Sequence, residues 1–407
     1  MTQVVIPFGK ENSRKSKGDN KKTNRTIARL DAERRERIIQ LRKQREVRAH
    51  SIDYSILFLV LFLVGFGLIV LYSTSSYRGS ALYGDPAYWL KRQGFFSIVG
   101  IVIMLLISKF FNYKILKKHD IFLWIIYLSI VALLAATLIS GSASHGSSRW
   151  IGIGSIRFQP SELAKLFLIL YLAIYINDHA SQLQRPVGLI KPLLGALVII
   201  GLVGFENFST AVILVGITLV MLFVAHPKIY PFFLILGMLG AGGYLLISLK
   251  GYRMDRIAAF LGQSDGGAND QTMNALYAIG SGGLFGKGLG QSMQKMILPE
   301  AYNDMIFSII CEELGLFGAI CVIALFFCLI WRFMVATVNA SDLLGSMICV
   351  GVIAHIASQV FINIAVATNI IPNTGIPLPF ISYGGSSMVF LLAEMGIMLS
   401  VTRYLRI

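Results

Sequence analysis

The sequence has few charged residues outside one short segment, and it has long apolar runs instead. Of its 407 residues, 55% are hydrophobic and only 14% are charged, which leaves too little polar surface for a soluble protein of this length. Apolar stretches of about 17–25 residues, each long enough to cross a bilayer, recur along the chain. The composition therefore excludes an ordinary soluble enzyme and predicts a polytopic membrane protein with a single integral domain.

The chain also lacks the patterns of redox, nucleotide and repeat-based transport proteins. Its four cysteines lie in apolar stretches, without a CxxC pair or a histidine at metal spacing, so packing is their expected role. The Gly-rich stretch YAIGSGGLFGKGLGQSMQK is not a Walker A loop, because Ser281 replaces the first glycine and Gly288 follows Lys287. No internal repeat is apparent, so an inverted-repeat transporter gains no support.

Positive charge is concentrated in the first part of the chain. Residues 1–50 hold 15 Lys/Arg against 6 Asp/Glu. A cationic segment beside the first span suits the anionic inner leaflet and, by the positive-inside rule, lies in the cytoplasm. We therefore predict that residues 1–50 form a basic, partly disordered cytoplasmic tail that does not bind nucleic acid, and we expect no cleavable signal peptide.

Ten apolar segments predict an all-α membrane domain of ten transmembrane helices over residues 51–407, with both termini in the cytoplasm. A long extracellular loop, at about residues 250–305, separates the seventh and eighth spans, and loops of this length are usually functional. The predicted spans are 54–73, 94–109, 120–140, 161–177, 191–205, 208–225, 229–249, 306–331, 343–368 and 380–402.

Polar residues gather at the outer end of the fourth predicted span, in SSRWIGIGSIRFQPSELAK. Arg149 and Trp150 are expected at the outer interface, where Trp is often a membrane-belt residue. Glu162 follows Pro160 in the first helical turn, where an acid is favoured, and Lys165 shares its face. We predict an ion pair between Glu162 and Lys165 that is either structural or functional, because ionisable residues within spans are usually functional.

Acidic residues frame the start of the eighth predicted span, in LPEAYNDMIFSIICEELG. Glu300 and Asp304 stand before the apolar run, and Asp304 is expected at its outer mouth, as a reactive group or as a helix cap. Glu312 and Glu313 follow about 12–14 Å deeper at helical rise. Their candidate partners are two cations of the fourth-span motif, Lys165 and Arg149.

Two further stretches favour a site at the outer face. The Gly-rich stretch carries Lys287 and Lys295 and has exposed backbone, which suits an anionic lipid headgroup held through N–H groups. The stretch NTGIPLPFISYGGSS interrupts the helical pattern before the last span and contains Ser386. Irregular backbone at membrane depth is tolerated only where it lines protein or a wet cavity, so this stretch predicts a site.

Together these motifs resemble the SEDS family (shape, elongation, division and sporulation proteins). The stretches that carry the resemblance are SSRWIGIGSIRFQPSELAK, YAIGSGGLFGKGLGQSMQK, LPEAYNDMIFSIICEELG and IPLPFISYGGSS, within about residues 52–407. The resemblance implies a ten-span enzyme that polymerises lipid II at the outer face of the bacterial plasma membrane. Within the family, the chain is more similar to the cell-division branch, FtsW, and the sporulation branch is close.

Two positions depart from the family pattern. Tyr302 and Asn303 precede Asp304, where the family more often has His-Thr before the Asp, so a required His is not expected there. Thr374 stands where the division branch can have Lys, and it therefore receives no cationic role.

The resemblance implies an inverting glycosyltransferase for septal cell-wall synthesis, which releases undecaprenyl pyrophosphate. Asp304 matches the catalytic residue of the family, its general base. No organic cofactor is expected, although Mg²⁺ or Mn²⁺ bound jointly with the pyrophosphate is. The expected substrate-binding residues are Arg149, Trp150, Glu162, Lys165, Lys287, Lys295, Glu300 and Ser386.

The implied partners are lipid II, undecaprenyl-linked glycan, a class B penicillin-binding protein transpeptidase and other divisome membrane proteins. The expected location is the plasma membrane at the division septum. Three alternatives stay open: a lipid II flippase, a scaffold that only positions the transpeptidase, and a RodA-like elongation polymerase. A requirement for Asp304 in glycan synthesis by the purified protein separates a polymerase from a flippase or a scaffold.

Overall fold

The computed structural model describes most of the predicted membrane domain. The described residues are 36, 51–117, 120–140, 142–144, 147–153, 156–248, 260, 267–299 and 301–405. The predicted basic tail, apart from Glu36, therefore lies outside the described residues, and so does Glu300. Residues Ile52–Arg406 form one compact unit, which is the part considered below.

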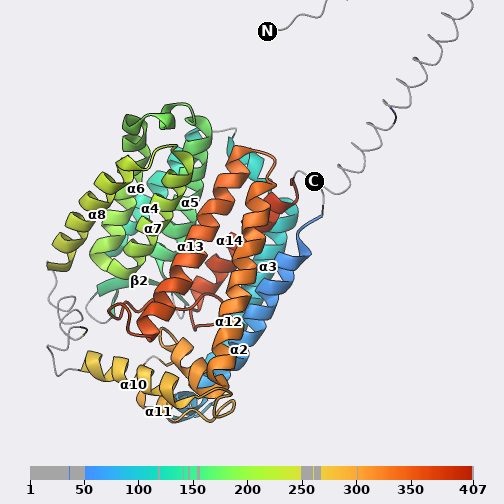
Figure 1. The fold of residues 1–407 in the computed structure, drawn as a ribbon, viewed down its shortest axis with the longest axis vertical. Coiled ribbons are helices and arrows are strands. Elements are labelled where there is room, and N and C mark those ends of the chain that lie inside the picture. The colour runs from blue at the N-terminus through green and yellow to red at the C-terminus, as the bar shows by residue number, and fades with distance from the viewer. Residues whose placement is uncertain are drawn as a thin grey trace, which may run out of the picture. The chain divides into compact units, whose positions relative to one another are not determined.

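Each of the ten predicted spans overlaps one α-helix (Figure 1). Among the described residues, α2, α3, α5, α6, α7, α12 and α13 are long and apolar enough to cross a membrane, and α4, α8 and α14 contain shorter apolar segments. The count of ten crossings stays a prediction. The helices are α2 (Tyr54–Tyr83), α3 (Tyr88–Phe110), α4 (Asp120–Ser140), α5 (Pro160–Asp178), α6 (Ile190–Glu206), α7 (Phe208–Ala225), α8 (Tyr230–Ser248), α12 (Ile306–Val338), α13 (Leu343–Ala367) and α14 (Ser386–Thr402).

Asp53 joins three helices at one end of the bundle. Its carboxylate accepts hydrogen bonds from the N–H groups of Ser55 and Ile56, at 2.9 and 3.3 Å, and so caps α2. The same carboxylate pairs with Arg332 of α12, and the Asp53 N–H donates to the Thr402 hydroxyl of α14 at 3.1 Å. The first helix therefore begins where the last one ends, and we call this the terminal end.

The helices pack around α13. This helix contacts α5, α7, α12 and α14, and about two-thirds of the residues in its most apolar stretch are buried. In Figure 1 it runs between α12 on one side and the group of α5 and α7 on the other. A helix that is largely buried all round can carry polar side chains only where they find partners, which makes its polar residues informative about a site.

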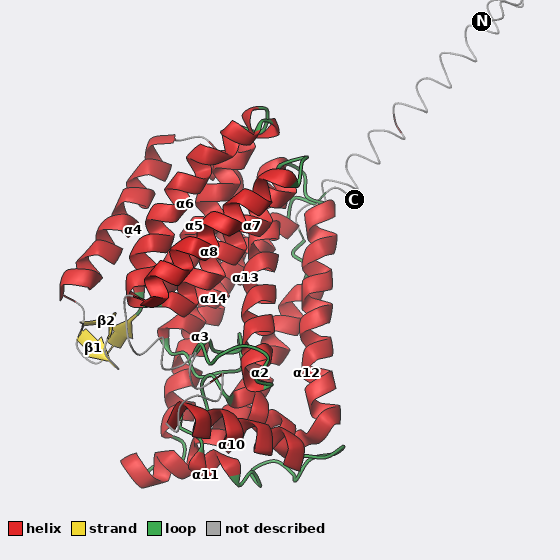
Figure 2. Cartoon of the chain, turned by 60° about the vertical axis from the view of Figure 1, so that its left-hand side comes forward, coloured by secondary structure: helices red, strands yellow, loops and turns green. Residues whose placement is uncertain are grey.

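Short elements close the opposite end, which we call the loop end. Two further helices, α10 (Gly267–Ser281) and α11 (Gln294–Ile297), lie across it within the long loop predicted between the seventh and eighth spans (Figures 1 and 2). Three short 3₁₀ helices are also described, one between α3 and α4 and two between α5 and α6, away from the loop end: η1 (Tyr113–Lys117), η2 (Gln182–Gln184) and η3 (Pro186–Leu189).

A small antiparallel sheet is added to the otherwise helical domain, in the connection between α4 and α5. The strands pair in the order β1-β2-β3 beside the end of α4 (Figure 2). Gly154-Ser155 separates β2 from β3 in the sequence, and such a dipeptide is typical of a two-residue hairpin loop. The strands are β1 (Ser142–Ser144), β2 (Ser147–Ile153) and β3 (Ile156–Phe158).

The Gly-rich segment is inserted into a break in α12. Gly315 has a φ of +68° and a ψ of −168°, which interrupts the helix. The N–H groups of Lys287 and Gly288 donate to the carbonyls of Glu312 and Glu313, both at 2.9 Å. These two N–H groups are thus already bonded within the protein, and the expectation that N–H groups of this segment hold a lipid headgroup stays a prediction.

Candidate functional site

Asp304 lies in the turn that leads into α12, and its side chain is buried at 6% exposure. The Nδ2 of Asn363 in α13 donates to the Asp304 carbonyl and to the Ile376 carbonyl, both at 2.8 Å. The Ser382 hydroxyl donates to the Asn303 carbonyl. The backbone on which Asp304 stands is therefore fixed by α13 and by the irregular segment before α14.

A turn from that irregular segment faces the Asp304 carboxylate. A Cβ added to Gly375 would lie 3.7 Å from Asp304 Oδ2, so this turn approaches the acid closely. The Gly375 N–H donates to Asn373 Oδ1 at 3.0 Å, and Asn373 Nδ2 donates to Gln271 Oε1 of α10 at 3.1 Å. Elements far apart in the sequence thus converge on one carboxylate.

An aromatic cluster supports the same turn. The ring of Trp89 stacks on Tyr302 at 5.1 Å between centroids and meets Tyr383 edge-on at 4.8 Å. The Tyr383 N–H also donates to the Tyr302 carbonyl at 3.0 Å. Stacked and edge-on aromatic pairs typically contribute about 0.5–1.5 kcal/mol each beyond their buried area, so α3 helps to hold the turn before α12.

Glu162 and Lys165 form the predicted ion pair, with Lys165 Nζ 2.9 Å from Glu162 Oε2. The two side chains are 14% and 3% exposed, so the pair is largely buried. Glu162 also lines a small pocket whose wall includes Gln359 and Ser382. Because Ser382 holds the backbone next to Asp304, this pocket and the Asp304 turn share one structural support.

Lys287 and Lys295 lie in the Gly-rich segment and α11, and each pairs with a glutamate of α12. Lys287 Nζ is 2.7 Å from Glu312 Oε1, and Lys295 Nζ is 3.6 Å from Glu313 Oε1. The expectation that Lys165 would pair with these glutamates is wrong, because Lys165 is engaged within its own helix. The sequence could not reveal these partners because no local spacing relates them.

The structure gives less information on the remaining predicted substrate-binding residues. Arg149 and Trp150 belong to β2, but their side chains are not described, so an ion pair of Arg149 with the α12 glutamates stays untested. Glu300 lies outside the described residues. Ser386 is the first residue of α14, and its buried hydroxyl has no hydrogen-bond partner among the described residues.

Comparison with known proteins assigns this arrangement to a family. The sequence profile of the FtsW/RodA/SpoVE family, described as a cell cycle protein, matches residues 54–407. The chain belongs to the FtsW/RodA/SpoVE family. The SEDS resemblance predicted from the four motifs is therefore confirmed, and the apolar helices together with this family make the chain a multi-pass membrane protein.

Curated relatives and solved structures of the FtsW/RodA/SpoVE family match nearly the whole membrane domain. Stage V sporulation protein E of Bacillus subtilis (strain 168) is 37% identical, over 88% of this chain and 98% of its own length. The probable peptidoglycan glycosyltransferase FtsW of Geobacter sp. (strain M18) is 33% identical, over 88% of this chain and 99% of its own.

Two solved structures share the fold. A chain from a peptidoglycan synthase complex that coordinates polymerization and crosslinking has a TM-score of 0.70 at 26% identity, with 87% of this chain and 98% of that chain covered. The rod shape determining protein RodA of Thermus thermophilus has a TM-score of 0.62 at 27% identity, with 87% and 97% covered.

Several residues of the site were not predicted from the sequence of this FtsW/RodA/SpoVE chain. Gln359 and Asn363 are one helical turn apart in α13, and Gln359 Nε2 donates to the Pro377 carbonyl at 2.9 Å. Gln93 of α3 accepts hydrogen bonds from the N–H groups of Gly384 and Gly385, at 3.2 and 3.0 Å. Polar amides inside apolar spans were the available signal, because such residues are usually functional or structurally bonded.

A deeper buried pair also escaped prediction. His355 Nδ1 of α13 lies 2.8 Å from Glu394 Oε2 of α14, and both side chains are almost fully buried. His355 lies two turns before Asn363 on the same helix. The pair therefore ties α13 to α14 below the irregular segment.

The described residues suit a divalent cation only as a ligand shared with substrate. They include no cluster of three His, Cys, Asp or Glu side chains that could hold a metal. Mg²⁺ at phosphate sites usually keeps several waters and takes one or two carboxylates besides the phosphate oxygens. Asp304, and Glu162 if released from Lys165, are the carboxylates of the site that fit that description.

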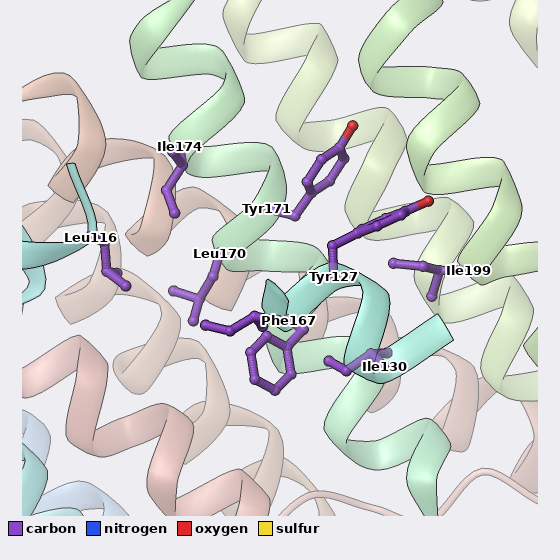
Figure 3. Close-up of a pocket in the computed structure, with 9 residues that line it drawn as sticks. Leu116, Tyr127, Ile130, Phe167, Leu170, Tyr171, Ile174 and Ile199 are labelled. Carbon is purple, nitrogen blue, oxygen red and sulfur yellow. The ribbon is translucent and has the colours of Figure 1, made fainter. Parts of the chain in front are cut away.

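A second pocket is lined by apolar and tyrosine side chains and contains no carboxylate. It lies between α4, α5 and α6, and the hydroxyl of Tyr127, which lines it, donates to the Gly195 carbonyl at 2.9 Å (Figure 3). No charged side chain lines it, and the titratable groups in its lining are the phenols of Tyr127 and Tyr171. Its lining residues are Leu116, Ile126, Tyr127, Ile130, Phe167, Leu170, Tyr171, Ile174 and Ile199.

Proposed function

We propose that the chain is a peptidoglycan glycosyltransferase that polymerises lipid II into glycan strands. The relatives named probable peptidoglycan glycosyltransferase and the peptidoglycan synthase complex with the same fold support this proposal. Its site is the loop end of the bundle, which faces the outside if the basic tail lies in the cytoplasm.

The single observation that carries the proposal is the placement of Asp304. Its carboxylate is buried, its backbone is held by Asn363, and a glycine turn from a distant segment approaches it closely. A carboxylate used only as a helix cap would not need supports from α13, α10 and the segment before α14. A catalytic base needs them, because proton transfer requires fixed geometry.

The reaction can be written in terms of this base. The 4-hydroxyl of one lipid II attacks the anomeric carbon of the lipid-linked growing chain, and a new C–O bond forms. The bond from that carbon to the pyrophosphate oxygen breaks, so undecaprenyl pyrophosphate leaves and the anomeric configuration inverts. Asp304 accepts the hydroxyl proton during the attack and later returns it to solvent. Such a base typically contributes about 10²- to 10⁴-fold to the rate.

The leaving pyrophosphate requires positive charge close by. Lys165 is the candidate on α5, with Glu162 as its orienting partner at 2.9 Å. Arg149 of the neighbouring strand is a second candidate, and Trp150, Glu300 and Ser386 complete the proposed substrate contacts. When bound, Mg²⁺ or Mn²⁺ would supply further charge to the pyrophosphate.

Septal synthesis in cell division is the proposed biological role. The curated relatives named stage V sporulation protein E and FtsW, at 37% and 33% identity, support the sporulation and division branches. The proposed partners are a class B penicillin-binding protein and other divisome membrane proteins, at the plasma membrane of the septum.

The decisive experiment is polymerisation of lipid II by the purified protein with its cognate class B penicillin-binding protein. We expect Asp304→Asn to lower the rate by at least about 100-fold, because the amide cannot accept the proton. The variant should still fold and bind its partner, as judged by its unfolding temperature and by co-purification. Near-normal polymerisation by Asp304→Asn would falsify the assigned mechanism and favour a flippase or a scaffold.

A further inference from the structure

The Gly-rich segment bridges the break at Gly315, between the first two turns of α12 and the rest of the helix. In a regular helix, the N–H groups of Leu316 and Phe317 would donate to the carbonyls four residues earlier. Here they donate to the carbonyls of Gly283 and Leu284, at 2.9 and 3.1 Å, and the carbonyls four residues earlier accept from the same Gly-rich segment. The direction of Ile306–Leu314 is therefore set by the loop rather than by helical continuity.

Glycines make this insertion possible. A Cβ at Gly286 would lie 2.2 Å from the Glu313 carbonyl oxygen, and a Cβ at Gly315 would lie 2.4 Å from the Gly286 nitrogen. Both residues have positive φ values, which L-residues with side chains rarely adopt. The Gly-rich segment and the break at Gly315 thus form a close backbone contact that tolerates little movement, and we call this contact the joint.

The ammonium group of Lys295 has two hydrogen bonds and one ion pair at this joint. It donates to the Ser73 carbonyl at 3.2 Å and to the Gly290 carbonyl at 2.6 Å, and it lies 3.6 Å from Glu313 Oε1. Its side chain is only 6% exposed. This burial among protein partners suits a lysine that holds the joint better than one that binds a pyrophosphate.

Glu313 ties the same joint to α2. Both of its carboxylate oxygens accept from the Ser73 hydroxyl, at 2.7 and 2.5 Å, and the Gly290 N–H donates to that hydroxyl at 2.9 Å. Ser73 belongs to α2, so the joint connects two membrane helices through one loop.

The Glu312 carboxylate accepts four hydrogen bonds. Its carboxylate accepts from Lys287 Nζ at 2.7 Å, from the Ser292 hydroxyl, and from the N–H groups of Met293 and Gln294 at 3.2 and 3.3 Å. These partners lie in the segment that leads into α11 and then to the Asp304 turn. Glu312 thus holds the chain on both sides of Asp304.

Asp304 stands two residues before α12 begins, so the direction of Ile306–Leu314 contributes, together with the bonds from Asn363 and Ser382, to where its carboxylate lies. We propose that Lys295 and Glu313, together with Lys287 and Glu312, are positioning residues that place the Asp304 carboxylate for proton transfer. They are then not ligands of the pyrophosphate. This inference rests on the proposed function, since it assigns the residues to the same reaction.

The test compares single and paired neutral variants in the purified complex with lipid II. Lys295→Met should lower kcat by at least about tenfold and leave KM within about twofold, because a misplacement of 1 Å can cost about 100-fold in rate. Lys295→Met/Glu313→Gln leaves no unpaired charge at the joint, so its kcat should return to within about threefold of the wild type. The matched control is Lys91→Met in the exposed Lys91–Asp85 pair, which should change neither constant.

The opposite pattern would overturn the inference. If Lys295 binds pyrophosphate, Lys295→Met should raise KM about tenfold or more, and the paired variant should be no better than the single one. Glu313→Asp provides a test that does not depend on the folding of the neutral variants, because it keeps the charge and only shortens the side chain. It should lower kcat severalfold at unchanged KM, and an unchanged kcat in the folded variant would also overturn the inference.

Failure of the proposed function would look different. In that case the wild-type complex would not polymerise lipid II, or Asp304→Asn would polymerise it normally. The positioning inference alone fails when the wild type is active and depends on Asp304, while the Lys295 and Glu313 variants follow the ligand pattern or keep the wild-type kcat.

Discussion

The Glu162–Lys165 pair offers a direct test of how charge is held at the site. Lys165 Nζ lies 2.9 Å from Glu162 Oε2, with the lysine side chain 3% exposed and the glutamate 14% exposed. Removing one partner of a buried pair typically costs about 3–5 kcal/mol, because the remaining charge is stranded. Lys165→Met should cost about 3 kcal/mol, since Glu162 lies in the first turn of α5, where the helix N-terminus stabilises an acid.

The paired variant separates the structural role from the functional one. Glu162→Gln/Lys165→Met removes both charges and should be more stable than Lys165→Met by about 1.5 kcal/mol or more. Its polymerisation rate should nevertheless stay at least about tenfold below the wild type, because the charge proposed to stabilise the leaving pyrophosphate is gone.

The assay needs both quantities from the same preparations. The free energy of unfolding comes from denaturant titration in detergent micelles, and the rate comes from lipid II polymerisation per folded molecule. Lys91→Met, in an exposed ion pair, is the control for loss of a lysine at the loop end. If the paired variant is no more stable than Lys165→Met, the stranded-charge reasoning is refuted, and if it polymerises normally, Lys165 does not act on the substrate.

Two further predictions concern the support of Asp304 and the tail. Asn363→Leu should lower kcat by at least about tenfold, because two buried carbonyls lose the amide that fixes the Asp304 turn. Near-wild-type kinetics of this variant would mean that the turn is held without α13. Deletion of residues 2–45 should leave polymerisation within about twofold per folded molecule, because the tail and the site are predicted on opposite sides of the membrane. A large loss in a truncated protein that still folds would contradict this division of roles.

The helices could be predicted from the sequence because apolar runs of membrane length are a strong and local signal. The predicted spans 120–140 and 208–225 have the same bounds as α4 and α7, and each of the other predicted spans overlaps one helix, although α2, α3 and α12 extend well beyond theirs. Irregular features were predicted less well. The sequence predicts one continuous span over 306–331, whereas Gly315 breaks α12 after two turns.

The site was predictable in its residue types but not in its contacts. The pairing of Glu162 with Lys165 follows from i,i+3 spacing on one helix. The pairing of Glu313 with Ser73 joins residues 240 positions apart, and no spacing rule connects them. Asn363 and Asp304 are likewise 59 positions apart in the sequence, and their contact depends on how α13 packs.

The spacing of two polar contacts between α2 and α12 can be compared with the thickness of a membrane. Asp53 pairs with Arg332 at the terminal end, and Ser73 bonds Glu313 at the loop end. At helical rise, the two contacts lie about 30 Å apart along either helix, which is about the thickness of a hydrocarbon core. Polar contacts at these two levels match the helices to a bilayer of that thickness, since a thicker one would bury them in lipid. Asp304, nine residues before Glu313 in the chain, then lies beyond the hydrocarbon boundary, where a carboxylate can meet a sugar without entering the lipid.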